Sequence, residues 1–267
     1  MGLALGGGAA RGLAHIGVLS VLEKAGIPID MIAGTSMGAI VGALYAAGKS
    51  PAEIRKAMTK LNLYQMVSLI DLSIPTSGFI KGKKITDWLR SIIGEVHFRD
   101  LRIPFACNAT DIGLCEEVIM KEGPVAEAVR ASASIPVVFT PAKWHGRYLV
   151  DGVLLDPVPV RVVREMGADL VIAVNVVPYI GDKLQREAAA CPPEEAKSPS
   201  VFNIMVRMLY VIGFQAAQAS LREADAVIGP EVGHVRSEQF HRLRECVLCG
   251  EKAAEATLPT IKSLLRD

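Results

Sequence analysis

The sequence predicts an α/β protein whose mainly parallel central sheet carries helices on its faces. Two short apolar runs bounded by glycine, GLAL at 2–5 and DMIAG at 30–34, are typical of buried strands. Each precedes a longer segment with apolar residues at helical spacing, at 9–26 and at 37–48. Strands that alternate with helices favour a parallel sheet, because each helix packs against a face of the sheet between two strands.

The segment SPAE predicts the start of the next helix. Ser50 can cap it, Pro51 fits the first helical position, and Glu53 can complete a capping box. We expect further helices after it, separated by a loop at 73–79. The KGKK segment at 81–84 is interpreted as a solvated face, and a phosphate-binding role is the alternative.

The rest of the chain continues the alternation. The sequence predicts strands at 105–112, 116–120, 168–177 and 225–232, an extended segment around a turn at 147–155, and helices at 123–135, 159–167 and 200–224. A proline-rich, charged surface loop is expected at 181–199, and a helix closes the chain. Because we find no internal repeat or clear linker, we expect one domain over 1–267.

The helix after residue 200 carries an apolar stripe at helical spacing. Its members are Val201, Ile204, Met208, Val211 and Ile212, widened by Met205, Leu209 and Phe214. Such a stripe usually faces a core, which is the first interpretation. The alternative is that part of it lines an acyl channel or touches a membrane surface, because methionines adapt to varied chains.

Composition narrows the functional classes. Lys plus Arg number 29 and Asp plus Glu 28, which argues against a nucleic-acid partner. The first residues, MGLALGGG, lack the basic and apolar regions of a secretory signal. The odd count of 5 cysteines indicates reduced thiols, as expected of a cytoplasmic protein. Cys246 and Cys249 form a CxxC without a second pair for zinc, so we interpret them as two cysteines one turn apart near the start of a helix.

Residues 31–48 contain no charged side chain and reach the lower length limit of a membrane span. Four glycines, Thr35 and Ser36 fit such a span poorly. We therefore predict a strand, a turn and a buried helix there.

The turn in that segment, GTSMG, fits the Gly-x-Ser-x-Gly pattern of a nucleophile elbow. Ser36 lies between Gly34 and Gly38, after a predicted strand and before a predicted helix. A nucleophilic serine needs a tight, strained turn, so its neighbours must be small. Ser36 is therefore the candidate nucleophile.

The glycine run at 6–8 is the candidate oxyanion hole, because glycines leave their amides accessible and the run follows the first strand. Two rival glycine motifs fail on particular residues. A dinucleotide fingerprint needs glycine where Arg11 stands and an acid where Gly34 ends the second strand. A phosphate loop needs lysine after Gly12, but Leu13 follows.

The base that would activate Ser36 stays open on the residues alone. His234 and His241 have the serine-then-histidine order of α/β-hydrolases, and neither is excluded. His15 lies inside the first predicted helix and is interpreted as a packed or capping residue. Asp151-Gly152 between apolar runs is, taken alone, a common hairpin turn.

In combination, these motifs resemble the patatin-like phospholipase family in its bacterial branch. The resemblance rests on GGGAARG at 6–12, HIGVL at 15–19, GTSMG at 34–38 and Asp151-Gly152, and it runs from residue 2 to about 175. The later EADAVIGPEVGH is similar to the tail of the same branch.

The resemblance implies a three-layer α/β/α fold and a lipid acyl hydrolase that uses a Ser–Asp dyad without a catalytic histidine. It makes Ser36 the nucleophile, Asp151 the base, and the amides near Gly7 and Gly8 the oxyanion hole. It implies a lipid or acyl-ester substrate, with peripheral membrane contact as an option. It also implies a reaction that needs no metal or nucleotide cofactor. The residues that would support these motifs are Gly6, Arg11, Gly12, Gly34, Gly38 and Gly152.

One residue departs from the family pattern. The family has glycine or alanine after Asp-Gly, whereas this chain has Val153, which could alter the turn beside the base. The first functional hypothesis, which rests on the resemblance as a whole, is a serine hydrolase. The second is a non-enzymatic relative that binds or regulates, against which the intact Ser36, Asp151 and glycine run argue.

Overall fold

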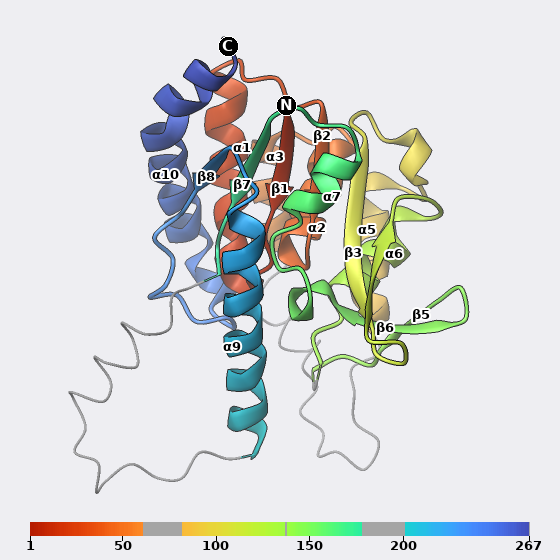
Figure 1. Cartoon of the computed structure of the whole chain (residues 1–267). Coiled ribbons are helices and arrows are strands. Elements are labelled where there is room, and N and C mark those ends of the chain that lie inside the picture. The colour runs from red at the N-terminus through yellow and green to blue at the C-terminus, as the bar shows by residue number, and fades with distance from the viewer. Residues whose placement is uncertain (61–81, 137, 178–200, 267) are drawn as a thin grey trace, which may run out of the picture.

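The computed structural model describes residues 1–60, 82–136, 138–177 and 201–266 (Figure 1). The loops expected at 73–79 and at 181–199 lie outside the described residues. Figure 1 shows a central sheet between two groups of helices, with both chain ends at the same end of the molecule.

The described strands form a single mixed sheet that is parallel at its centre. They are β1 (Gly2–Leu5), β2 (Met31–Gly34), β3 (Phe105–Asp111), β4 (Glu116–Met120), β5 (Ala142–Trp144), β6 (Arg147–Asp151), β7 (Val171–Val174) and β8 (Ala226–Ile228). The order is β5-β6-β3-β2-β1-β7-β8, with β4 also paired to β3. The pairs from β3 through β2, β1 and β7 to β8 are parallel, and β4, β5 and β6 make the antiparallel pairs.

Helices cover both faces of this sheet. They are α1 (Ala14–Lys24), α2 (Met37–Ala46), α3 (Pro51–Lys60), α5 (Lys83–Ile93), α6 (Val125–Ser132), α7 (Val160–Glu165), α9 (Val201–Leu221) and α10 (Leu243–Leu264), with 3-10 turns η1 (Ala9–Leu13), η2 (Phe98–Asp100), η3 (Gly152–Leu154) and η4 (Phe240–Arg242). Leu3 and Leu5 of β1 point into a large core with α1, α2 and α10, whereas Ala4 points into a smaller core with α7 and α9. The predicted three-layer α/β/α fold is confirmed.

Several local predictions also hold. Helix α1 ends before Gly26, which has a positive φ of 67°. Before α3, Ser50 and Glu53 form the capping box: the Ser50 amide donates to Glu53 Oε2 at 2.9 Å, and the Glu53 amide donates to Ser50 Oγ at 3.3 Å. The uncharged segment 31–48 is β2 followed by α2, as predicted.

Two local predictions are wrong, and one strand of the structure was not predicted. The first helical segment begins as the 3-10 turn η1, and regular α-helix starts only at Ala14. The segment after Asp151 is not extended: the carboxyl of Asp151 caps η3 by accepting the Val153 amide. Strand β5 was not predicted, because its three residues carry no periodic signal.

Helix α9 presents its apolar stripe to the surface rather than to the core. Ile204, Met208, Val211 and Ile212 are all exposed, whereas Gly213 and Ala217 are buried. The first interpretation, a stripe facing the core, is therefore wrong for these four residues. Of the wider stripe, Leu209 and Phe214 are half-buried, and the side chains of Val201 and Met205 lie outside the described residues.

Among the described helices, none combines the length and the apolar character that crossing a membrane requires.

Candidate active site

The candidate site forms where the carboxyl ends of β1 and β2 meet. The two strands are parallel and in register, with Leu5 opposite Gly34. The glycine run that follows β1 and the Ser36 turn that follows β2 therefore lie side by side. In Figure 1 this is the end of the sheet opposite the two chain ends.

The Ser36 turn is strained in the way that a nucleophile elbow requires. Ser36 caps α2 with φ 54° and ψ −117°, a conformation that non-glycine residues rarely adopt. A Cβ on Gly34 would lie 2.5 Å from the Gly38 carbonyl oxygen, and a Cβ on Gly38 would lie 2.1 Å from the Leu5 carbonyl oxygen. Both glycines are therefore required by close backbone contacts, and they fix where Ser36 points.

Asp151 lies directly against the serine hydroxyl. Ser36 Oγ donates to Asp151 Oδ2 at 2.7 Å, and the two residues are 4% and 3% exposed. The Val153 amide donates to Asp151 Oδ1 at 3.0 Å, which orients the carboxyl group. The predicted nucleophile and base, which are distant in sequence, are thus in contact.

Burial changes the acidity of that carboxyl. Desolvation raises the pKa of Asp151 to about 7, while the hydrogen bonds from Ser36 and from the Val153 amide act in the opposite direction. A carboxylate with such a pKa is a far stronger base than an exposed aspartate, and it still exists in its ionised form near neutral pH.

The glycine run is held in place by its own backbone. The Gly6 amide donates to the Val174 carbonyl at 3.1 Å, and the Gly7 amide donates to the Pro157 carbonyl at 2.8 Å. The Gly8 amide makes no hydrogen bond to any other described residue. The next residue, Ala9, has a φ of 48°, so the run ends in a second strained turn.

Two of the three histidines considered at first have other hydrogen-bond partners. His15 is fully buried, and its Nε2 lies 2.7 Å from the Gly6 carbonyl; burial lowers its pKa to about 4. It is the packed residue that the sequence predicted. On the surface, His234 Nε2 lies 2.7 Å from Glu245 Oε1. His241 lies in η4. Ser36 Oγ donates its hydrogen bond to Asp151 and not to any of these histidines.

The motif-supporting residues pack around this centre. Arg11 is buried, and its Nε donates to the Val235 carbonyl at 2.8 Å, which ties η1 to the segment before η4. A Cβ on Gly12 would lie 2.5 Å from Met37 Cγ, and one on Gly152 would lie 2.6 Å from Asn108 Oδ1. These glycines therefore allow η1 and η3 to approach their neighbours closely.

Buried polar residues that sequence reasoning missed form a network behind Ser36. Thr35 Oγ1 lies 2.8 Å from Asn108 Oδ1 and 3.0 Å from the Asp156 carbonyl, and Asn108 Nδ2 donates to the same carbonyl at 2.9 Å. The Ser36 amide donates to Ser132 Oγ at 2.9 Å. The one available signal was a polar pair, Asn108 and Thr110, inside an otherwise apolar strand.

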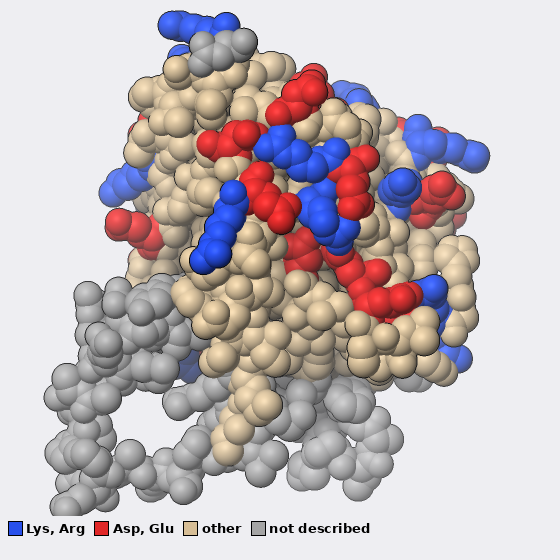
Figure 2. All heavy atoms as spheres, viewed as in Figure 1, with Lys and Arg blue, Asp and Glu red and all other residues tan. Residues whose placement is uncertain are grey.

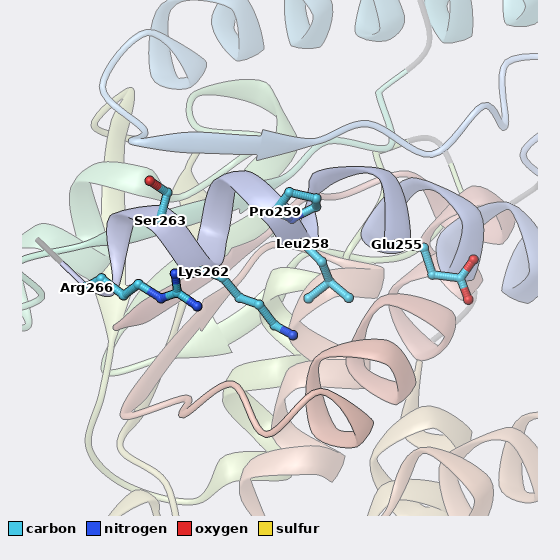
Figure 3. A pocket seen from close by; sticks show the side chains of 6 residues that line it. All are labelled: Glu255, Leu258, Pro259, Lys262, Ser263 and Arg266. Atoms are coloured by element: carbon cyan, nitrogen blue, oxygen red, sulfur yellow. The ribbon is translucent and has the colours of Figure 1, made fainter.

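A shallow pocket elsewhere contributes nothing to this site. It lies on the last turns of α10 and is lined by Glu255, Leu258, Pro259, Lys262, Ser263 and Arg266 (Figure 3). The end of α10 lies beside the chain ends in Figure 1, whereas β1 and β2 run towards the opposite end of the sheet, where the Ser36 turn follows β2.

Comparison with known proteins agrees with this geometry. A family model described as patatin-like phospholipase matches residues 3–164. The chain belongs to the patatin-like phospholipase family.

Among curated proteins, the patatin-like chain is similar to members of the NTE family. An uncharacterized NTE family protein of Mycobacterium bovis is 43% identical over 176 residues, covering 65% of this chain and 48% of the relative. The lysophospholipase NTE1 of Pyricularia oryzae is 32% identical over 94% of this chain and 18% of its own length. The chain thus spans about half of the first relative and less than a fifth of the second.

Among solved structures, the patatin-like fold is matched by VipD from Legionella pneumophila. The TM-score is 0.59 at 15% sequence identity, over 97% of this chain and 66% of that chain. At this identity the match supports the fold alone.

The departure from the patatin-like pattern, Val153, fits without disturbing the turn. A Cβ on Gly7 would lie 2.3 Å from Val153 Cγ2, and a Cβ on Gly213 of α9 would lie 3.0 Å from Val153 Cγ1. The valine therefore fills the space left by two glycines that lack side chains. Its amide still donates to Asp151 Oδ1, so the valine is compatible with the contact between Asp151 and Ser36.

Proposed function

We propose that the protein is a serine acyl-ester hydrolase in which Ser36 and Asp151 form a catalytic dyad. The observation that carries the proposal is the buried hydrogen bond from Ser36 Oγ to Asp151 Oδ2, 2.7 Å long, on a strained elbow. Family membership supports the same chemistry. A buried serine–carboxylate pair of this kind provides both a nucleophile and its base.

In the proposed reaction, Asp151 accepts the hydroxyl proton as Ser36 Oγ attacks the ester carbonyl carbon. The tetrahedral intermediate then expels its alkoxide, which takes the proton from Asp151, and an acyl-enzyme remains on Ser36. A water molecule next gives a proton to Asp151 and attacks the acyl carbonyl. The fatty acid leaves as Asp151 returns the proton to Ser36, so no metal or nucleotide takes part.

We propose the amides of Gly7 and Gly8 as the oxyanion hole. The Gly8 amide is the more available of the two, since it has no hydrogen bond to another described residue. The Gly7 amide already donates to the Pro157 carbonyl, so it would have to share its hydrogen with the substrate oxygen. One good donor in a dry site lowers the barrier by about 3 kcal/mol.

We propose a lipid acyl ester, of the phospholipid or lysophospholipid class, as the substrate. The fungal relatives are named lysophospholipases, and four exposed apolar residues of α9, Ile204, Met208, Val211 and Ile212, suit contact with a lipid surface. Figure 2 shows charges of both signs gathered over the upper part of this face, whereas the described residues at its lower centre are mostly uncharged. We place the enzyme in the cytoplasm, as a single domain acting at the surface of a lipid aggregate.

Labelling with a fluorophosphonate probe tests the proposal. The wild-type protein should acquire one covalent phosphonate on the tryptic peptide that contains Ser36, and Ser36→Ala should acquire none. The wild-type protein should also release fatty acid from a lysophospholipid. A folded protein that neither reacts nor hydrolyses would instead be the binding or regulatory relative.

A further inference from the structure

We propose that Asp156 is a positioning residue for the Ser36–Asp151 dyad. Its carboxyl group accepts a hydrogen bond from Ser220 and so holds the loop that follows Asp151 against helix α9. This inference rests on the proposed function. Ser220 Oγ donates to Asp156 Oδ1 at 2.9 Å, and Asp156 is buried.

The loop from Asp151 to Pro157 sets the position of each part of the site. Asp151 contacts Ser36, the Asp156 carbonyl accepts hydrogen bonds from Thr35 and Asn108, and the Pro157 carbonyl accepts the Gly7 amide. A shift of this loop would therefore move the base, the elbow and the glycine run relative to one another. Errors of about 1 Å in such an arrangement can cost on the order of a hundredfold in rate.

Helix α9 holds the loop with one face and is exposed on the other. Gly213, Ala217 and Ser220 recur at helical spacing; Gly213 contacts Val153, Ala217 is buried, and Ser220 bonds Asp156. The exposed apolar residues lie on the opposite side of the helix. The Ser220–Asp156 hydrogen bond is thus the polar link between α9 and the loop of the base.

Fold stability does not explain a carboxyl group at this place. Burial, together with the nearby Glu117 carboxylate, raises the pKa of Asp156 to about 7. The opposing groups are Ser220, Arg161 and the Val158 amide. A buried carboxyl group with such a pKa costs folding free energy at neutral pH, so a role in the site accounts for it better.

Four variants and a control test the inference. Ser220→Ala and Asp156→Ala each remove one partner of the hydrogen bond, and the double variant removes both. In Asp156→Asn the amide oxygen can still accept from Ser220. Gln218→Ala, at an exposed position of the same helix, is the control. We would measure kcat and KM on a p-nitrophenyl ester, and the thermal midpoint of each variant.

The inference predicts that Ser220→Ala and Asp156→Ala each lower kcat about tenfold with KM within about twofold, as for a displaced base. The double variant should lose no more than the worse single variant, because both changes remove the same hydrogen bond. Asp156→Asn should keep kcat within about threefold of the wild type. The control Gln218→Ala should have the kcat of the wild type.

Other outcomes would overturn the inference. These are kcat values of the alanine variants within about twofold of wild type, losses that only track the unfolded fraction, or an Asp156→Asn as slow as Asp156→Ala. A wild-type protein that does not hydrolyse the ester would overturn the proposed function as well, which separates that failure from the failure of the inference alone.

Discussion

The two halves of the proposed dyad are held in different ways. Ser36 is fixed by the backbone of its own turn, because Gly34 lies too close to the Gly38 carbonyl, and Gly38 too close to the Leu5 carbonyl of β1, for either to carry a side chain. Asp151 ends β6 at the antiparallel side of the sheet, and its loop is fixed by contacts from Thr35, Asn108 and α9. The nucleophile therefore depends on close backbone contacts around one turn, and the base depends on side-chain contacts from distant segments.

The largest expected effect is on the base. Asp151→Asn should lower kcat/KM by about a thousandfold or more, since residues that act as a unit lose most of the rate together. Its thermal midpoint at pH 8 should equal or exceed that of the wild type, because a buried carboxylate is removed. Steady-state kinetics and thermal denaturation check both parts.

The exposed Asp169→Asn is the matched control and should change neither quantity. An Asp151→Asn variant that keeps over a tenth of the wild-type rate would mean that the base is another residue.

A crowding test probes the contact between the glycine run and the loop of the base. Gly7→Ala would place a Cβ 2.3 Å from Val153 Cγ2 and 3.3 Å from Ser36 Cβ. We expect kcat/KM to fall about a hundredfold, because the nucleophile and its oxyanion donors are displaced. Removing the valine methyls with Val153→Ala in the same chain should recover at least about tenfold.

The single Val153→Ala variant serves as the control and should stay within about threefold of the wild type. If Gly7→Ala were as active as the wild type, or if the double variant gained nothing, these two segments would not be in contact as described.

Activity and stability should respond to pH in opposite directions. Asp151 must be ionised to act as base, so with its pKa at about 7 we expect kcat/KM to fall about tenfold per pH unit below 7. Asp151 and Asp156 both have folded pKa values raised to about 7, above the unfolded value of about 3.9. Their contribution to stability is full below pH ~4 and is lost as the pH rises towards 7.

Urea denaturation at pH 5 and pH 8 checks the stability half of this prediction. The free energy of unfolding of Asp156→Asn relative to the wild type should rise between pH 5 and pH 8 by an amount on the order of 1 kcal/mol or more. A difference that does not change with pH would show that Asp156 titrates as an ordinary exposed carboxyl.

The smallest effect is expected on α9. Met208→Gln should lower kcat/KM on a C16 p-nitrophenyl ester about threefold while leaving the C4 ester unchanged, because an exposed apolar side chain acts through lipid contact alone. Leu248→Gln, an exposed apolar position on α10, is the control. Equal losses on both chain lengths would argue against lipid contact at this face.

The same contrast explains what the sequence could and could not predict. The elbow was predictable because its serine and both glycines form one contiguous motif, residues 34–38, between a predicted strand and a predicted helix. Asp151 needed the family resemblance, since Asp-Gly alone also fits a hairpin turn. Asp156 and Ser220 were missed because their contact joins segments 64 residues apart, and the exposed stripe of α9 was misjudged because periodicity does not tell which face is covered.

The central claim is that Asp151, and no histidine, is the base for Ser36, and the rate of acylation measures this most directly. The rate of p-nitrophenol release with enzyme in excess over substrate should be compared for wild type, Asp151→Asn and the double variant His234→Ala/His241→Ala. We expect a loss of about a thousandfold or more for Asp151→Asn and less than about tenfold for the histidine variant. A folded histidine variant as slow as Asp151→Asn would contradict it.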